Sequence, residues 1–589
     1  MDQSMLEFAQ NYEPVFKPKF QQKVDEFFDS LVNESAVNVQ QNHESSEQYR
    51  KYAADVEHLD KQIGKYRGWR GFFIFLAVLA FGAAVTMIVL AILDYVNNGG
   101  GKTLMFALIG VGCIALGVGM VLLVTKRYNK LLKDLQAKRD AAQAVADKQY
   151  NECMAQVAPL HRLLWRSKLY QIIEETLPTV KFDLNFNMKR YDLLNGKYGL
   201  SENTNPDQST VGLISGEVLG NPFVEERRFC MNMGTQVYTG SIVISWTESY
   251  TDSEGHSHTR MRSETLFASV EKPKPFYRYL TRMVFGCEAA PNLSFSHQPT
   301  HAEDLSEGQL GRKVKRDAKA LQKQARKAAT TGSSGFTEMA NQEFDALFNA
   351  EDRDNEVEFR LMFTPLAQKN MLYLMKMKEP YGDDFDFTKH KMLNFITSEH
   401  GQTWQFEEDN SAYMKYDVAL CREAMKAYYQ HFFQNFFFEI APLLSIPLYQ
   451  QHKSTEYIYK TKYHRNFTGY ESEVLANCFS TAMFAHPETE TDVILKTQLL
   501  AKGANVDELT VEAHGFRTVQ HTEYVTKLGG DGNFHQVPVD WVEYIPVSRT
   551  SEIDMTTEDG ANAGGSRVTK HGLAASYIKY FADRDKNGE

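Results

Sequence analysis

Cysteine is scarce in this sequence, and the spacing of its cysteines excludes the roles that this residue most often has. The 589 residues include six cysteines, with no Cys-x-x-Cys pair among them. Neither a disulfide framework nor a zinc knuckle is therefore predicted, and we expect reduced thiols in a cytosol-facing protein. The cysteines are Cys113, Cys153, Cys230, Cys287, Cys421 and Cys478.

Catalytic sequence motifs are also absent. The chain contains no G-x-S-x-G, no H-E-x-x-H and no G-x-G-x-x-G, which removes common signatures of hydrolases, zinc proteases and dinucleotide-binding enzymes. The run NNGGGKT ends like a phosphate-binding loop, but Val96 stands where the first glycine of that motif belongs. A net charge of −11 argues against a general nucleic-acid binder. The sequence thus predicts no catalytic residue, no cofactor and no metal ligand.

Charge is missing altogether from two long apolar runs, Phe72 to Leu93 and Leu104 to Val124. Each is longer than the roughly 18 residues that mark a candidate membrane-crossing helix, and neither contains proline. The two runs therefore predict a transmembrane helical hairpin, with NNGGGKT (Asn97 to Thr103) as its polar turn.

Basic residues flank this predicted hairpin on one side of the membrane. The positive-inside rule then places both termini in the cytoplasm and only the short turn outside. The expected location is the cell (cytoplasmic) membrane, as a multi-pass protein. The flanking residues are Lys61, Lys65, Arg67 and Arg70 before the first run and Lys126, Arg127, Lys130 and Lys133 after the second.

Apolar stripes continue beyond both ends of the hairpin and predict a helical, coiled-coil-like stalk. The alternative is that the stripes pack on the soluble domains. Pro159 is expected to kink or end the second helix. The stripe residues are Tyr49, Tyr52, Val56, Leu59, Ile63 and Tyr66, then Leu131, Leu135, Ala142 and Val145. Within the spans, close helix approach is expected at the small-residue pairs Ala80 with Ala84 and Ala115 with Gly119.

Strand-like alternation begins at about residue 179. One β-hairpin is predicted over Val237 to Lys272, and a second closes through the glycine-rich loop Gly529 to Asn533. Pro538 is expected on an edge strand because it lacks a backbone N–H group. In the first hairpin, the predicted apolar faces consist of Ile242, Ile244 and Trp246 on one strand and Leu266, Ala268 and Val270 on the other.

Two groups of polar residues could be ligands or catalytic groups, but each has a plainer interpretation. His256 and His258 form an H-x-H pair at the tip of the first hairpin, where a solvated turn is favoured over a metal site because no further ligand is identifiable. Asp383, Asp384 and Asp386 with His390 could form a hydrolase or metal cluster. Loop and helix-cap roles are favoured for these carboxylates.

Two further segments have an unusual composition. Gly308 to Ser334 is predicted to be a linker containing a basic helix, either solvated or in contact with anionic lipid headgroups. The possible lipid contacts are Arg312, Lys313, Lys315, Arg316, Lys319, Lys323, Arg326 and Lys327. The aromatic run His431 to Tyr449 contains polar residues and two prolines, so a helix buried in a soluble domain is favoured over a membrane-surface segment.

Several stretches together resemble a family of uncharacterised bacterial membrane proteins. They are the hairpin anchor, EFRLMFTPLAQKNMLYLM (Glu358 to Met375), the following YGDDFDFTKHKMLNFI, and GGDGNFHQVPVDWVEYIPV near the C-terminus. The family consists of two-span membrane proteins of the domain-of-unknown-function type, mostly from low-GC Gram-positive bacteria. The resemblance covers most of the chain and implies a bacterial cytoplasmic membrane. It implies no activity, cofactor or catalytic residue.

The expected fold class is α+β: a transmembrane helical hairpin, a helical stalk and large cytoplasmic β-containing domains. The expected parts are an N-terminal helical region (1–66), the hairpin (67–125), the stalk (126–178), a first β-rich domain (179–300), a basic linker helix (301–345), a second α+β domain (346–548) and a polar tail (549–589).

The expected function is that of a non-enzymatic scaffold or binding protein, anchored in the lipid bilayer and facing an unknown cytosolic protein partner. A homo-oligomer is compatible with the predicted stalk, and nucleic acid is not expected as a partner. One alternative is a membrane-tethered enzyme with a site assembled from scattered loop residues. The other is a homo-oligomeric membrane pore.

Overall fold

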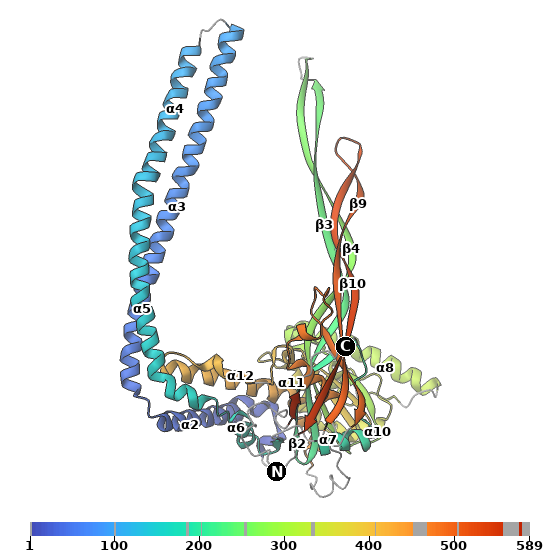
Figure 1. The fold of residues 1–589 in the computed structure, drawn as a ribbon. Coiled ribbons are helices and arrows are strands. Elements are labelled where there is room, and N and C mark those ends of the chain that lie inside the picture. The colour runs from blue at the N-terminus through green and yellow to red at the C-terminus, as the bar shows by residue number, and fades with distance from the viewer. Residues whose placement is uncertain are drawn as a thin grey trace, which may run out of the picture. The chain divides into compact units, whose positions relative to one another are not determined.

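The computed structural model describes residues 3–98, 102–183, 188–201, 203–251, 256–331, 336–406, 408–451, 468–502, 506–557 and 576–579. It is a mixed helix and sheet protein, as the sequence predicts (Figure 1). The chain divides into two compact units. The first comprises Met1–Val24, Arg166–Asp409 and Tyr429–Glu589, and the second comprises Asp25–Trp165 and Asn410–Tyr428.

Long helices build the second unit. Helices α3 (Val39–Asn98) and α4 (Thr103–Leu123) form a hairpin, and α4 continues through η3 (Val124–Tyr128) into α5 (Asn129–Leu164) (Figure 1). Oδ2 of Asp94 accepts hydrogen bonds from the Lys102 backbone N–H (2.8 Å) and the Thr103 hydroxyl (3.1 Å). A carboxylate therefore caps the start of α4, where the helix dipole favours negative charge.

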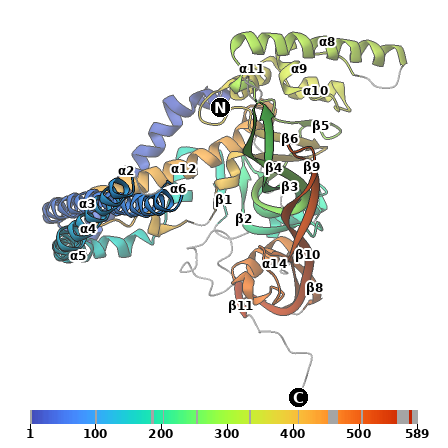
Figure 2. The same cartoon turned by 90° about the horizontal axis from the view of Figure 1, so that it is seen from above.

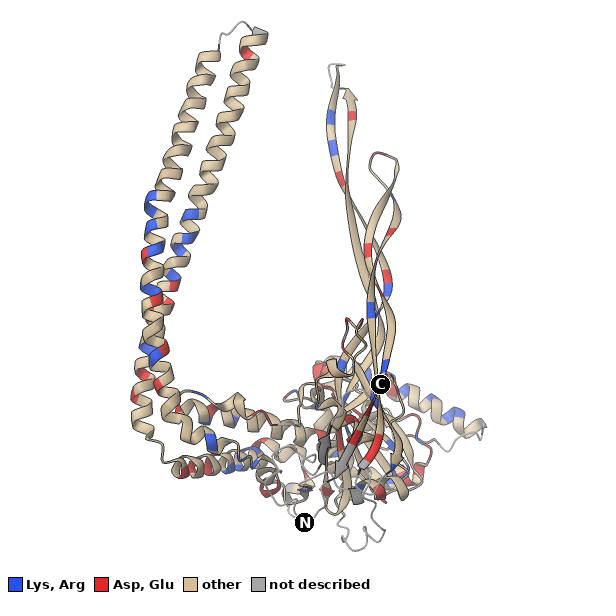
Figure 3. Cartoon of the chain, viewed as in Figure 1, with Lys and Arg blue, Asp and Glu red and all other residues tan. Residues whose placement is uncertain are grey.

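Both arms of this hairpin are long and apolar enough to cross a membrane. Their apolar side chains point away from the protein instead of into a core: Val78, Val85, Leu108 and Val111 are 62% to 65% exposed. Figure 3 shows the contrast between the uncharged parts of α3 and α4 and the charged parts that precede the first run in α3 and follow the second in α5. The two predicted spans are therefore candidate membrane-spanning helices.

Small residues line the contact between α3 and α4, but only part of the predicted set. Ala84 is buried there and Ala80 is half-buried, whereas Ala115 and Gly119 are exposed, so the second predicted pair is not part of the contact between α3 and α4. The contacting positions recur every seven residues. This spacing keeps the same face of each helix against its partner when the two helices supercoil slightly around each other. A Cβ atom on Gly117 would lie 2.9 Å from the Phe81 ring, which occupies the space that the glycine leaves. The buried small residues are Ala77, Ala84, Ala91, Gly110 and Gly117.

The predicted stripes outside the spans do bring α3 and α5 together. Ile63, Leu132 and Leu135 form a buried cluster, flanked by Leu59, Tyr66 and Leu131. Two details of the prediction are wrong. Val145 is 48% exposed, and the neighbouring Ala146 is the buried residue. Of the two effects expected of Pro159, an end of the helix is wrong, because α5 continues to Leu164, where buried Val157, Leu160 and Leu164 supply apolar contacts.

A seven-stranded antiparallel sheet dominates the first unit, in the order β1-β2-β3-β4-β7-β6-β5. Three of these strands come after residue 290 and pair beside β4, so one sheet joins strands from both of the expected β-containing segments, 179–300 and 346–548. The strands are β1 (Val180–Phe182), β2 (Gln208–Val218), β3 (Asn221–Thr251), β4 (Ser257–Gly286), β5 (Ser294–His297), β6 (Phe385–His390) and β7 (Leu393–Ser398).

A second, four-stranded sheet has the order β11-β10-β9-β8. Its long hairpin of β9 (Val506–Leu528) and β10 (Phe534–Thr557) closes through Gly529 to Asn533, which confirms the predicted loop. At Pro538, β10 pairs with β9 alone among the described strands, as expected for proline at an edge. The remaining strands are β8 (Ile494–Lys502) and β11 (Ser576–Lys579).

The hairpins β3–β4 and β9–β10 lie side by side and pack through one apolar cluster (Figure 1). The predicted faces are confirmed, because Ile244, Leu266 and Ala268 are buried in this cluster against Val537 and Val539. Ile242, Trp246 and Val270 pack at its border. We call the stacked part of these two hairpins the β arm, meaning Gly234 to Trp246, Glu264 to Lys274 and Arg517 to Ile545.

Helices surround the large sheet of the first unit (Figure 2). The aromatic run predicted to be a buried helix forms the C-terminal part of α12 (Val418–Leu444), where Phe433, Phe436 and Phe437 are fully buried, and this confirms the prediction. Among the described residues, the other α-helices of the chain are α1 (Gln3–Leu6), α2 (Lys17–Ser35, mostly in the second unit), α6 (Leu169–Thr176), α7 (Met188–Gly196), α8 (Glu307–Thr331), α9 (Gln342–Phe348), α10 (Glu356–Met362), α11 (Pro365–Lys376) and α14 (Gly469–Asn477).

Candidate functional sites

One face of the β3–β4 hairpin is exposed and carries no charge over most of the β arm. Strand pairing places the odd-numbered residues of β3 and β4 on the same face, and all of these residues from Thr235 to Thr251 and from Ser257 to Ser269 are exposed. We call this set the outer face. It consists of Thr235, Val237, Thr239, Ser241, Val243, Ser245, Thr247, Ser249, Thr251, Ser257, Thr259, Met261, Ser263, Thr265, Phe267 and Ser269.

The opposite face of the same hairpin holds the charged residues, and each of them has a partner. Glu248 accepts hydrogen bonds from Arg260 and from Arg262. Glu264 accepts one from the Gly530 backbone N–H at 2.7 Å. Lys272 pairs with Glu523 at 2.6 Å, across the contact between the two hairpins. Among the described residues from Thr239 to Ser269, charge is therefore confined to this opposite face, and Glu271, paired with Val237, is a charged residue at the base of the outer side.

The basic helix predicted from sequence is α8, and its cations are arranged asymmetrically. Its apolar side packs on the first unit, with Leu321 and Ala328 buried against Phe336, so α8 is more than a solvated linker. Lys313 is half-buried and pairs with Asp317 at 3.3 Å. The seven predicted cations that remain are exposed: Arg312, Lys315, Arg316, Lys319, Lys323, Arg326 and Lys327.

Contact between α8 and anionic lipid stays a prediction, and it can be tested on the full chain in nanodiscs. A bimane on Ala320→Cys should be quenched by nitroxide-labelled lipid when phosphatidylserine is present, but not in pure phosphatidylcholine. Each cation near an anionic surface contributes about 1 kcal/mol, so K315Q/K319Q/K323Q should weaken the contact by about 3 kcal/mol and abolish the difference in quenching. The control K378Q/K502Q/K527Q should keep it. Equal quenching in both lipids would contradict the prediction.

A buried polar network surrounds His400, at the end of β7. Its Nδ1 lies 2.7 Å from Oδ2 of Asp384, and its Nε2 lies 3.4 Å from the Ser398 hydroxyl and 3.5 Å from Oε2 of Glu439 on α12. The Tyr381 ring stacks on the imidazole with centroids 4.1 Å apart. Ser398, His400 and Asp384 are thus arranged in space like the nucleophile, the base and the orienting acid of a catalytic triad.

The Ser398 hydroxyl, however, is not available as a nucleophile. It donates a hydrogen bond to Glu439, and Ser398 is only 2% exposed. The network instead joins β6 and β7 to α12 through one imidazole. Sequence motifs could not reveal it, because its members lie at positions 384, 398, 400 and 439. The polar residues Asn435 and Glu439 interrupt an aromatic run in the sequence, and this was a weak indication of a buried polar site.

Burial controls the protonation of this network. It raises the pKa of Glu439 to about 7, although the neighbouring His400 acts in the opposite direction. Burial alone would lower the pKa of His400, but Asp384 and Glu439 together raise it. Burial, with Glu439 and Glu226 nearby, raises the pKa of Glu225, and neither oxygen of Glu225 has a hydrogen-bond partner among the described residues. Burial therefore favours the neutral form of Glu225.

The aspartates predicted as loop or cap residues are divided between two histidines. Asp383 is fully buried, lies 2.9 Å from Nε2 of His297 and accepts hydrogen bonds from the backbone and hydroxyl of Thr300. Asp384 belongs to the network of His400. Asp386 and His390 are on the exposed side of β6. The four residues therefore do not converge on a common site.

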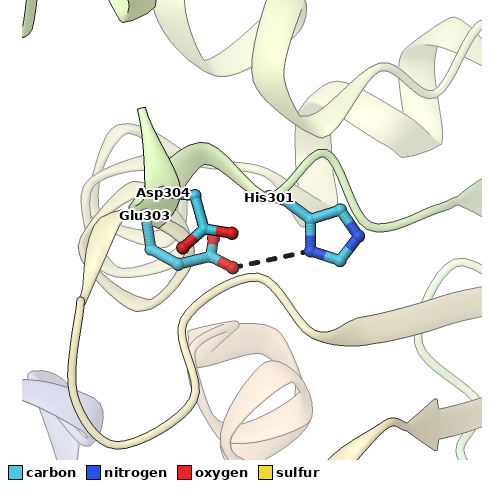
Figure 4. Close-up of side chains that lie close together, drawn as sticks. All are labelled: His301, Glu303 and Asp304. Carbon is cyan, nitrogen blue, oxygen red and sulfur yellow. Dashed lines mark ion pairs between the residues drawn. The ribbon is translucent and has the colours of Figure 1, made fainter. Parts of the chain in front are cut away.

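Three potential metal ligands lie together in a short segment beside Asp383. His301, Glu303 and Asp304 offer ligand atoms within 4.8 Å of one another, and this is the one such group among the described residues (Figure 4). His301 and Asp304 are exposed, and Glu303 already accepts a hydrogen bond from the Asp383 backbone N–H at 3.1 Å. Metal ligands are normally held in place by further hydrogen bonds, and the two exposed ligands of this cluster lie on the surface of a short turn.

The histidine pair at the tip of the first hairpin is exposed. His258 stacks on Tyr250 with ring centroids 5.6 Å apart, and His256 lies just before β4 begins. Neither belongs to a group of three potential metal ligands among the described residues.

A ligand-sized cavity of about 850 Å³ lies between α14, β8 and β9. Its charged lining residues include Glu473, Lys496, Lys502, Glu512 and His514. Lys496 is already engaged, because it pairs with Glu473 and donates hydrogen bonds to the carbonyl oxygens of Asn203 and Gln208. The cavity is lined mainly by polar groups.

Comparisons with protein-family models, with curated proteins and with solved structures found no match, so the arguments about function depend on the geometry of the chain itself.

Proposed function

We propose that this protein is a non-enzymatic, membrane-anchored scaffold that presents its β arm to another protein in the cytoplasm. The observation that carries the proposal is the outer face, an exposed and uncharged surface on a hairpin that is supported from behind by a second hairpin. A surface of this kind cannot form ion pairs with a charged partner. It therefore suits a partner whose contacting surface is also uncharged.

Membrane anchoring by α3 and α4 is supported by the length of the apolar segment and by its borders. At about 1.5 Å per residue, Phe72 to Leu93 would span about 33 Å, close to the roughly 30 Å of a hydrocarbon core. Trp69 and Tyr128 lie at the same end of the two spans, where Phe73 packs on Tyr128 with ring centroids 5.4 Å apart. Such aromatic residues are enriched at membrane–water interfaces.

The proposed topology, with both termini cytoplasmic, is tested by labelling with a membrane-impermeant maleimide. In a Cys113→Ala/Cys478→Ser background, Lys102→Cys at the turn should react in intact cells. Glu44→Cys, which precedes the first span, should react only after lysis. Labelling of Glu44→Cys from outside would contradict the topology, and loss of the protein from carbonate-washed membranes would contradict the anchor.

The tethered enzyme is the second candidate, because the cavity between α14, β8 and β9 brings His514, Glu512 and Lys496 around a ligand-sized space. Native mass spectrometry of the full chain in mild detergent separates the candidates. An oligomer or a bound protein favours the scaffold, whereas a monomer that retains a small metabolite favours the enzyme. A larger ring of chains that conducts ions in a planar bilayer would favour a pore.

A further inference from the structure

On the outer face, large and small side chains lie next to each other, and this surface shape suits a second sheet packed against it. Three of the four large apolar side chains face a small hydroxyl residue on the neighbouring strand: Val243 is paired with Thr265, Phe267 with Ser241, and Met261 with Thr247, whereas Val237, at the base of the face, is paired with Glu271. Alternating large and small residues allow two facing layers to interdigitate. Val243, Phe267 and Met261 are 67%, 68% and 82% exposed, so these three side chains are available to a partner.

The chemistry of this face limits what can cover it. A lipid core would remove water from a face rich in serine and threonine without offering partners to their hydroxyl groups, which is costly. An anionic partner would find no opposite charge on the described part of this face, and a cationic partner would find only Glu271, which lies opposite Val237 at its base. The matching surface must therefore be uncharged and must combine hydroxyl donors and acceptors with apolar side chains. Another copy of the same face meets these conditions.

The area is sufficient for a specific contact. From Thr235 to Thr251, at about 3.4 Å per residue, the face is about 55 Å long, and two strands about 4.8 Å apart make it about 10 Å wide. This gives about 550 Å² on each copy and about 1,100 Å² in total, just above the roughly 1,000 Å² expected of a biological interface. Anchoring both copies in one membrane would raise their effective concentration and favour a contact of this modest size.

We infer that the outer face of the β3–β4 hairpin is the interface between two copies of this chain, which pack face to face about a twofold axis. Such an interface uses the same patch on both copies. The inference rests on the proposed scaffold function and names its protein partner as a second copy. The covered side of each hairpin stays packed on its own β9–β10, so dimerisation requires no rearrangement of the apolar cluster around Ile244 and Val537.

Photo-crosslinking in the host membrane tests this inference. Two differently tagged full-length chains are co-expressed, each with p-benzoylphenylalanine in place of Val243. Ultraviolet light should give an adduct with twice the mass of the chain that carries both tags. The probe at Tyr524, an exposed residue (64%) on the other hairpin, is the matched control and should give no such adduct.

The outcomes separate the inference from the proposed function. An adduct with a different protein would overturn the dimer but leave the scaffold function in place, and no adduct at all would overturn both. F267E places an unpaired charge in the interface and should reduce the doubly tagged adduct at position 243 at least about tenfold. Y524E should leave it unchanged. An F267E variant that crosslinks like the wild type would overturn the inference.

Discussion

Substitution of Gly240 by valine is expected to separate the two hairpins of the β arm. Gly240 pairs with Ala268, and a Cβ atom there would lie 1.9 Å from the carbonyl oxygen of Pro538 and 3.0 Å from Cα of Val539. The obstacle is backbone, so it cannot move aside as a flexible side chain would. Overpacking typically costs about 1 to 3 kcal/mol, and we expect G240V to lie at the upper end.

Hydrogen exchange on the full chain measures this effect locally. A loss of about 3 kcal/mol corresponds to roughly a hundredfold faster exchange of backbone amides in residues 517–545, if these exchange through opening of the arm. Strands β2 and β7 should keep their protection. Valine is a good strand former, so the variant does not weaken β3 by itself.

The control for this substitution is the adjacent residue. Ser241 lies on the outer face, so S241V adds the same type of side chain on the exposed side of the same strand and should leave exchange in β9 and β10 unchanged. Equal exchange in G240V and the wild type would show that the hairpins are not in contact at Pro538.

Stability of the first unit is expected to fall as the pH rises from about 5 to 8, and Glu471 at the start of α14 should account for a large part of the change. Burial raises the pKa of Glu471 to about 7 from an ordinary value of 4.5, although hydrogen bonds from Thr468 act in the opposite direction. The folded state therefore holds a proton that the unfolded state releases. The stabilisation is complete below pH 4.5 and is lost as the pH rises through about 7.

A shift of the Glu471 pKa from 4.5 to about 7 corresponds to a change of about 3 kcal/mol in the free energy of unfolding. E471Q keeps an amide oxygen that can accept the Thr468 backbone N–H hydrogen bond of the capping box, and it has no proton to lose. We expect similar free energies of unfolding for E471Q and the wild type at pH 4.5, and E471Q to be more stable by about 3 kcal/mol at pH 8.

The difference between the two pH profiles is the quantity to measure, because Glu225 and Glu439 have raised pKa values as well and give both proteins a slope in the same direction. Glu508, exposed on β9 of the first unit, provides the control: the difference between the E508Q and wild-type profiles should be small. Parallel profiles for wild type and E471Q would contradict the prediction.

Local patterns in the sequence predicted much of the architecture. The uncharged runs marked α3 and α4, alternation with glycine-rich loops marked both long hairpins, and the polar residues and prolines within His431 to Tyr449 marked a buried helix. Each of these features depends on residues close together in the chain, where periodicity and turn chemistry act directly. The basic residues of α8 were also evident, although their contact with lipid remains a prediction.

Only the tertiary structure decided which surfaces and side chains meet. The absence of charge at odd positions from Thr235 to Ser269 is visible in the sequence, but a strand has two faces, and the packing of β9–β10 determines which one stays exposed. Asp383 and Asp384 are neighbours in sequence, yet they contact His297 and His400 in different networks. Such contacts depend on long-range strand pairing and on burial, which local periodicity does not encode.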